Sequence, residues 1–194
     1  MKLTSNIKAT NNMYTMAKKM NLLRRHIDNE YWFVLYTRPN FEKIIYKKLK
    51  ELGCNTYLPL QKELRHWNDR TVWIETPLFR SYIFIKTNLK EKDKAFKVNG
   101  ILNYVSFGSH LAILSEKEIE RIKQICSYKG KLSIEFDCPE LGAKVEINEG
   151  ALKGLIGFVT DTNDNRKIHI HIESLNCFAC VTINSDSILF KYIQ

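Results

Sequence analysis

The sequence has little that would anchor the chain in a membrane or build a fibrous assembly. No apolar run approaches the ~20 residues of a membrane-spanning helix, and no apolar block follows the N-terminal lysines, as it would in a secretory signal. No segment recurs at a solenoid period. The mixed composition, with 44% hydrophobic and 26% charged residues, excludes collagen and low-complexity chains. We therefore expect a globular protein without a membrane partner.

Motifs that carry catalysis or bind cofactors are also missing. There is no P-loop, no GxGxxG and no GxSxG context. Catalytic groups are sometimes assembled from distant positions, but no local context favours any of them. We therefore expect a protein that is not an enzyme and that needs no cofactor.

The cysteines and histidines do not complete a metal site. Five cysteines form an odd set in a chain without a secretory signal, which favours reduced thiols and a cytoplasmic protein. Cys177 and Cys180 have CxxC spacing, but no second CxxC or HxxxH accompanies them. His169 and His171 share one face of an expected strand, either as a metal-binding pair or as its solvated side. Since no third ligand is evident, we expect a solvated face and no metal.

The net charge of +9 is concentrated in the first two thirds of the chain. Residues 1–30 carry +4 and residues 31–125 carry +7, whereas residues 126–194 carry −2. A basic field of this kind favours a polyanion or an acidic protein face as partner. The alternative is a protein with a merely basic surface.

Hydrophobic periodicity predicts alternating strands and helices up to about residue 128. Tyr31–Tyr36 is an apolar run typical of a buried strand. Residues 41–52 have the 3.6-residue spacing of an amphipathic helix, with Asn40 as a candidate N-cap and Gly53 as its C-terminal glycine. Residues 63–75 read as a hairpin, 88–98 as a charged helix and 101–107 as a strand. Ser115 and Glu118 form a capping box that opens a further helix.

After residue 129 the pattern changes to short β segments separated by turn residues, which indicates a small barrel or sandwich. The prediction is an α+β fold: an N-terminal α/β sandwich with a mostly antiparallel sheet, followed by a small SH3-like β-barrel. The expected divisions are a basic flexible N-terminal extension at 1–30, the sandwich at 31–128, a linker at 129–140 and the barrel at 141–194.

Aromatic residues are placed on both faces of the predicted sheet. Tyr82 and Phe84 alternate along one strand, and Tyr31, Phe33 and Leu35 along another. For any one aromatic, a place in the core is the simpler interpretation. If helices cover only one face, the other apolar face needs a partner, which predicts a docking surface.

The segment 65–70 combines cations with an aromatic residue at the hairpin turn. Arginine attracts phosphate, and Trp67 or His66 can stack on an unpaired base. The alternative is a solvated turn with Trp67 tucked inward.

Several motifs together resemble the NusG family of transcription factors. They are Trp32–Lys43 (WFVLYTRPNFEK), Tyr57–Leu60 (YLPL), Thr76–Ile85 (TPLFRSYIFI) and Gly100–Gly108 (GILNYVSFG). Gly142–Gly154 is similar to the KOW motif. The Leu-Phe-x-x-Tyr and Tyr-Val-x-Phe-Gly patterns look closest to specialised paralogs, the UpxY antiterminators of capsular polysaccharide operons and RfaH. The resemblance implies an NGN domain joined to a KOW β-barrel.

The resemblance also implies sites. Docking on the clamp helices of RNA polymerase is implied for the matching aromatics Tyr36, Phe79, Tyr82, Tyr104 and Phe107. A nucleic-acid contact is implied for Arg38, which matches a basic position of the family. Charge and location add Lys43, Lys47, Arg65, His66 and Arg70 to that set. The family's hydroxyl-rich gate-loop motif is not matched by residues 91–94. Some RfaH-like proteins refold the KOW domain into helices, but the alternation in 168–172 and 177–183 predicts a constitutive barrel.

Three functions follow as hypotheses. The first is an operon-specific antiterminator, recruited by non-template DNA or leader RNA and acting on capsular or exopolysaccharide operons. The second is a general NusG-like elongation factor that couples polymerase to a ribosomal protein or Rho through the KOW domain. The third is a ribosome-associated RNA-binding KOW protein. A monomer is expected in each case.

Overall fold

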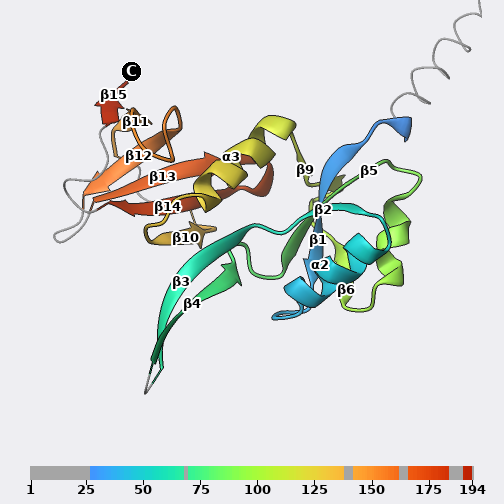
Figure 1. The fold of residues 1–194 in the computed structure, drawn as a ribbon. Coiled ribbons are helices and arrows are strands. Elements are labelled where there is room, and N and C mark those ends of the chain that lie inside the picture. Colours follow the sequence, from blue (N-terminus) through green and yellow to red (C-terminus); the bar gives the residue numbers. More distant parts are fainter. Residues whose placement is uncertain (1–26, 68–69, 138–141, 162–165, 184–189, 194) are drawn as a thin grey trace, which may run out of the picture.

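The computed structural model describes residues 27–67, 70–137, 142–161, 166–183 and 190–193 (Figure 1). The predicted N-terminal extension 1–30 lies almost entirely outside these residues. A mixed α+β fold with mostly antiparallel sheets and a β-rich C-terminal part is present, as the sequence predicts. Within the described part, no helix is long and apolar enough to cross a membrane.

The N-terminal sheet has the strand order β2-β5-β1-β6, with β9 also paired to β1. All of its pairings are antiparallel. Its central strand β1 is the apolar run that the sequence marks as buried, and four consecutive residues of it are buried. The strands are β1 (Tyr31–Thr37), β2 (Asn55–Tyr57), β5 (Tyr82–Thr87), β6 (Ile101–Tyr104) and β9 (Ile113–Leu114).

Helix α2 (Glu42–Glu51) covers one face of this sheet. Ile45 and Leu49 are fully buried in one cluster with the β1 and β5 side chains of that face. The helix is capped by Leu52, and Gly53 follows with φ +76°, the left-handed conformation predicted for it. The N-cap is Phe41 rather than Asn40, because the helix begins at Glu42 and Asn40 forms the left-handed turn before it, with φ +64°.

The opposite face of the sheet is covered as well, which corrects the expectation of a bare apolar face. Trp32, Val34 and Phe84 lie in one buried cluster with residues of helix α3 (Glu116–Cys126) and of the C-terminal sheet. Three isoleucines of α3, at positions 119, 122 and 125, are fully buried there. The predicted Ser115/Glu118 capping box opens α3. The capping box in the sequence indicated where α3 begins but not which surface the helix covers.

The C-terminal sheet is antiparallel, with the order β10-β14-β13-β12-β11-β15. It is built from strands and no α-helix in the described residues, as the alternation predicts. β10 lies inside the segment 129–140 that was expected to be a linker, and it pairs with β14. The strands are β10 (Leu132–Glu135), β11 (Lys144–Ile147), β12 (Ile156–Asp161), β13 (Arg166–Ile172), β14 (Cys177–Ile183) and β15 (Phe190–Tyr192).

Helix α3 and the segment just after it are hydrogen bonded to the C-terminal part. The Glu118 carboxylate accepts bonds from the Ser174 backbone N–H at 3.0 Å and from its hydroxyl at 2.8 Å. The Gln124 amide donates to the Lys153 carbonyl at 2.8 Å. Just beyond the helix, the Tyr128 hydroxyl donates to the Thr182 carbonyl at 3.2 Å. The two parts therefore share both a buried cluster and a polar contact.

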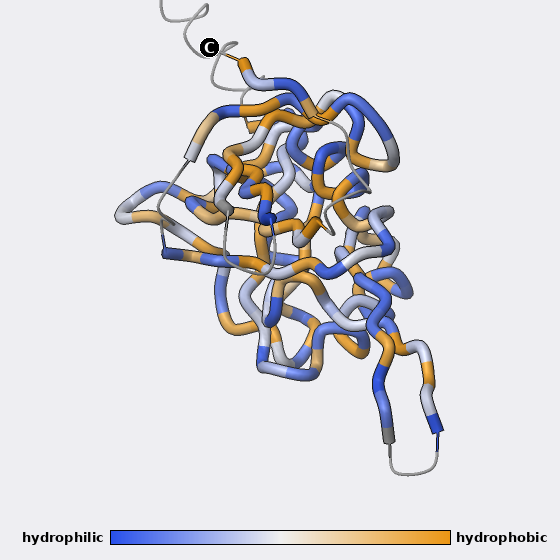
Figure 2. Tube along the Cα trace, turned by 90° about the vertical axis from the view of Figure 1, so that its left-hand side faces the viewer, coloured by the Kyte–Doolittle hydropathy of each residue, from blue (hydrophilic) through white to orange (hydrophobic). Residues whose placement is uncertain are grey.

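Strands β3 (Leu60–Trp67) and β4 (Arg70–Pro77) form the predicted hairpin, which projects from the body of the protein (Figures 1 and 2). Its turn residues 68–69 lie outside the described residues.

Two other predictions need correction. The segment 88–98, expected to be a helix, contains only a short 3-10 helix, η1 (Lys92–Lys97). The strand expected at 101–107 is interrupted at Val105. After this break, β7 (Ser106–Phe107) pairs with β8 (His110–Leu111).

Candidate functional site

Two of the predicted docking aromatics meet at one end of the N-terminal sheet. Tyr36 at the end of β1 is the direct partner of Tyr82 at the start of β5. Their rings make an edge-to-face contact at 6.0 Å between centroids. Tyr36 is 38% exposed and Tyr82 is half-buried, so this pair presents aromatic surface at the rim of the face that α3 covers. Burial, together with Cys177 and Tyr36 nearby, raises the pKa of Tyr82, which keeps its hydroxyl neutral.

Phe79 lies close to this pair in the sequence but is sealed inside the molecule. It is 1% exposed and packs edge-to-face on Phe84 at 5.6 Å. Both belong to the cluster that joins the sheet, α3 and the C-terminal part. In this arrangement of the chain no partner can reach the Phe79 ring.

Tyr104 and Phe107 do not join the same surface. Tyr104 is the partner of Leu35 in the β1–β6 register, so it points to the α2 face, where its ring contacts Phe33 at 5.7 Å. Its hydroxyl donates to the Lys92 carbonyl at 2.6 Å, and burial raises its pKa. Phe107 sits on the small β7–β8 ribbon and is 48% exposed. The spacing of aromatics in the sequence could not reveal this separation, because it depends on strand register.

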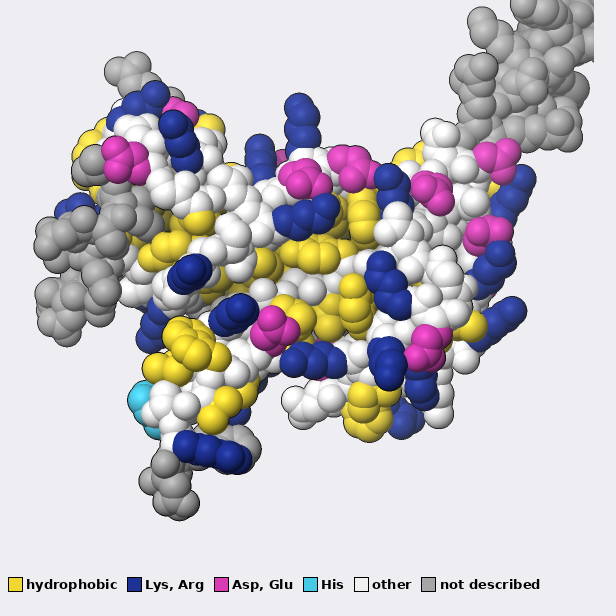
Figure 3. Space-filling model, viewed as in Figure 1, with side chains coloured by type: hydrophobic (Ala, Val, Ile, Leu, Met, Phe, Trp, Pro, Cys, Tyr) yellow, Lys and Arg dark blue, Asp and Glu magenta, His cyan; other side chains and the backbone are white. Residues whose placement is uncertain are grey.

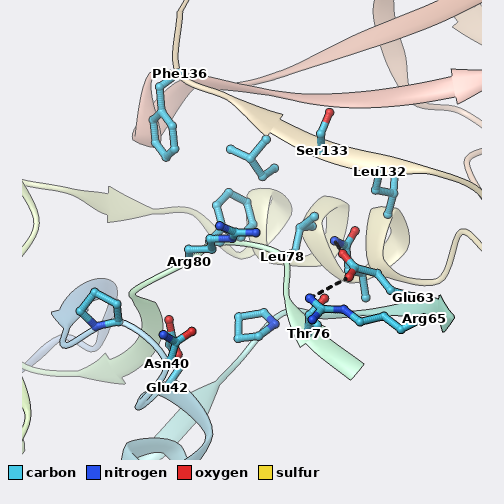
Figure 4. A pocket seen from close by; sticks show the side chains of 15 residues that line it. Asn40, Glu42, Glu63, Arg65, Thr76, Leu78, Arg80, Leu132, Ser133 and Phe136 are labelled. Carbon is cyan, nitrogen blue, oxygen red and sulfur yellow. Dashed lines mark hydrogen bonds and ion pairs between the residues drawn. The ribbon is translucent and has the colours of Figure 1, made fainter. Parts of the chain in front are cut away.

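Phe136 is an aromatic neighbour that the sequence analysis missed. Its ring lies 6.2 Å from that of Tyr82, although it follows β10 in the segment expected to be a linker. Phe136, Leu132 and Ser133 line one side of a pocket of ≈ 580 Å³, and Glu63, Arg65 and Thr76 of the hairpin line the other (Figure 4). The pocket therefore lies where the N-terminal sheet, the hairpin and the C-terminal sheet meet.

Three of the predicted nucleic-acid-binding residues lie on the hairpin. Arg65 and His66 on β3 and Arg70 on β4 are exposed. Arg70 pairs with Trp67, so it shares one face of the ribbon with Arg65, whereas His66 lies on the other face. Eight-residue strands span about 26 Å at about 3.3 Å per residue, which carries the end of the hairpin away from the body. Arg65 also lines the pocket where the hairpin meets the two sheets (Figure 4). Arg65 is 3.8 Å from the Glu63 carboxylate, and His66 Nδ1 is 2.8 Å from the Thr71 hydroxyl. Figure 3 shows basic, histidine and hydrophobic side chains along this arm.

The other three basic residues are exposed near the opposite end of the hairpin. Arg38 follows β1, and its backbone N–H donates to the Gly100 carbonyl at 2.9 Å. Lys43 on α2 donates to the Glu75 carbonyl at 2.6 Å, so its ammonium ties the helix to the base of β4. Lys47 lies one turn further along α2 and is exposed. The six predicted residues therefore form two groups rather than one surface.

The hairpin also carries exposed apolar side chains that the sequence analysis did not single out. Leu64 and Trp73 are cross-strand partners, 44% and 62% exposed. Val72 is 40% exposed on the same ribbon. In β4 the signal available in the sequence was the consecutive apolar run Val72–Ile74.

The C-terminal sheet contains the histidines that were expected on a solvated face. His171 is partly exposed and stacks on Phe178 at 4.6 Å between centroids. His169, however, is only 3% exposed, which contradicts the expectation. Burial lowers the pKa of His169 and raises that of Cys180 on the neighbouring strand to about 11, so both groups are uncharged near neutral pH.

Residues 30–123 match the family model described as "Transcription termination factor nusG". This segment is a NusG family domain. It runs from the start of β1 into α3, and it contains all of the aromatic and basic residues proposed above as contacts. Among solved structures, the chain is similar to one described as "Domain interaction in Thermotoga maritima NusG", with 17% identity, 80% of this chain and 93% of that chain covered, and a TM-score of 0.48.

Proposed function

We propose that this protein is an operon-specific transcription antitermination factor that binds RNA polymerase through its NusG family domain. The observation that carries the proposal is the family match over residues 30–123. The resemblance of the Leu-Phe-x-x-Tyr and Tyr-Val-x-Phe-Gly patterns to those of UpxY and RfaH supports capsular or exopolysaccharide operons as targets. A factor that binds the closed, elongating state of polymerase more tightly than the paused state shifts the population toward elongation.

The burial of the aromatic set divides the proposed docking residues into two groups. Tyr36 and Phe107 are accessible in the arrangement described above, and Tyr82 is accessible in part. Phe79 contributes to docking only after the C-terminal sheet has moved away, because it is sealed in the shared cluster. Tyr104 faces α2 and supports the domain core rather than a contact.

The hairpin is proposed to contact the recruitment element, which is exposed non-template DNA or leader RNA. Arg65 and Arg70 supply charge for phosphates, and His66 supplies a ring for stacking. The position of His66 and Arg70 near the end of a projecting arm allows contact at a distance from the docking surface, and Arg65 lies between them and the pocket.

Polymerase binding is tested by co-purification with the full-length protein. Tyr36→Ala and Phe107→Ala are expected to weaken binding by about tenfold each, as for anchor residues of an interface. Phe41→Ala is a matched control, because Phe41 is an exposed phenylalanine (45%) at the start of α2 that is not among the proposed docking residues. Equal binding by all three variants would refute the docking surface, and co-purification with ribosomes instead of polymerase would favour the RNA-binding alternative.

Operon specificity is tested by mapping the protein and polymerase across the genome. Occupancy at one or a few operons, with terminator read-through in reporters that carry their leaders, is the expected result. Occupancy at most transcribed genes would instead support a general NusG-like elongation factor.

A further inference from the structure

Three side chains that commonly bind metals meet on the C-terminal sheet, on the face opposite to Ile168 and Ile170. His169 on β13 is the direct cross-strand partner of Cys180 on β14. The other partner of Cys180 is Ser133 on β10, and Glu135 lies two residues further along that strand, on the same face. One potential ligand atom from each of Glu135, His169 and Cys180 lies within 4.8 Å of the other two.

His169 presents an unsatisfied nitrogen to this cluster. Its side chain is 4% exposed, and Nδ1 has no hydrogen-bond partner among the residues that the structure describes. The other nitrogen, Nε2, is 2.9 Å from the Thr160 hydroxyl. In the tautomer whose Nε2–H donates to Thr160, the Nδ1 lone pair faces Glu135. Metal-binding histidines are oriented by such a hydrogen bond on the far nitrogen, and buried polar atoms are rarely left without a partner.

The distances suit an ion between the two groups better than a direct bond. His169 Nδ1 is 3.4 Å from Glu135 Oε2. Two ligands at about 2.0 to 2.3 Å from a tetrahedral ion lie roughly 3.3 to 3.8 Å apart. The other carboxylate oxygen, Oε1, is 4.0 Å from the Lys167 ammonium, so that cation leaves Oε2 available.

We propose that Glu135, His169 and Cys180 bind a divalent transition-metal ion of the Zn²⁺ type, with water as the fourth ligand. A mixed set of carboxylate, imidazole and thiolate suits Zn²⁺, whereas Mg²⁺ and Ca²⁺ select oxygen ligands. Binding forms the metal–sulfur bond and releases the Cys180 S–H proton to solvent, without a redox change. The ion enters beside Glu135, the most exposed of the three, and fixes β10 to β13 and β14.

The site is tested on the full-length, reduced protein after chelator treatment, with Zn²⁺ in calorimetry and Co²⁺ in absorption spectroscopy. One ion per chain and a cobalt–thiolate charge-transfer band are expected. Cys180→Ala should abolish the band and weaken Zn²⁺ binding. Cys177→Ala is the matched control, because Cys177 is a buried thiol on the same strand that pairs with Ile172 and faces the other side; it should bind like the wild type.

A milder variant keeps the test informative if Cys180→Ala does not fold, which circular dichroism of the metal-free protein will show. Thr160→Val leaves all three ligands in place and removes the partner of Nε2, and it should weaken Zn²⁺ binding by about 10- to 100-fold. Absence of the cobalt–thiolate band in the wild type, or a Zn²⁺ affinity that neither Cys180→Ala nor Thr160→Val changes, would overturn the proposal.

Discussion

Replacing Glu118 by alanine should weaken the junction between α3 and the C-terminal sheet more than any other exposed-face change on that helix. The Glu118 carboxylate accepts hydrogen bonds from the Ser115 N–H and hydroxyl, each at 2.9 Å, and from the Ser174 N–H and hydroxyl. One side chain therefore closes the N-terminus of α3 and holds the C-terminal part to it.

The loss in free energy of unfolding caused by Glu118→Ala can be estimated from these two roles. Loss of a helix cap costs about 1 kcal/mol, and hydrogen bonds to a charged group contribute about 1.5 to 3 kcal/mol. The expected loss is about 2.5 to 4 kcal/mol, which lowers the melting temperature of a protein of this size by roughly 5 to 16 °C.

Thermal unfolding of three variants separates the roles of Glu118. Ser115→Ala removes only the cap, and Ser174→Ala removes only the hydroxyl contact across the junction. Glu120→Ala is the control, because Glu120 is exposed and pairs with Lys123 on the same helix, a contact worth about 0.3 to 0.5 kcal/mol. If Glu118→Ala melts at the same temperature as Glu120→Ala, the proposed role of Glu118 is wrong.

Three further outcomes are expected. Burial tends to raise the pKa of Glu118, but the hydrogen bonds from Ser115 and Ser174 outweigh it and hold the pKa below its ordinary value of 4.5. The wild type should therefore be more stable than Glu118→Gln by the full amount above about pH 4.5, and this difference should fade as the pH falls further. Thermal melts recorded across this pH range measure it. Ile122→Ala should cost about 2 to 5 kcal/mol in urea unfolding, because the side chain is fully buried. Replacing Arg65 and Arg70 together should weaken single-stranded DNA binding without lowering the melting temperature. The slope of log affinity against log salt concentration should fall by about one phosphate contact for each arginine. An unchanged slope would exclude the hairpin as a contact.

The sequence predicts local structure well where a single element decides it. The apolar run at Tyr31–Tyr36, the left-handed Gly53 and the capping box at Ser115 depend on neighbouring residues only, and each is found in the structure. The hairpin and the β character of the C-terminal part follow from alternation in the same way.

The candidate sites depend on contacts between distant segments, which the pattern of one strand does not contain. Register places Tyr104 on the α2 face, and the packing of the C-terminal part buries Phe79. The sequence pattern does not show Glu135 as a possible third ligand beside His169 and Cys180, because Glu135 is 34 positions before His169 and lies in the expected linker. Counting possible ligands along the chain cannot show that β10 pairs with β14.

The pairing of β10 with β14 has a practical consequence for dividing the protein into pieces. A C-terminal fragment that begins at residue 141 would omit β10 and leave one edge of β14 without its neighbour. The residues of β14 are almost all buried and apolar, and an uncovered strand edge of this kind promotes self-association. A fragment that begins before Leu132 retains the protecting strand and should be the more soluble of the two.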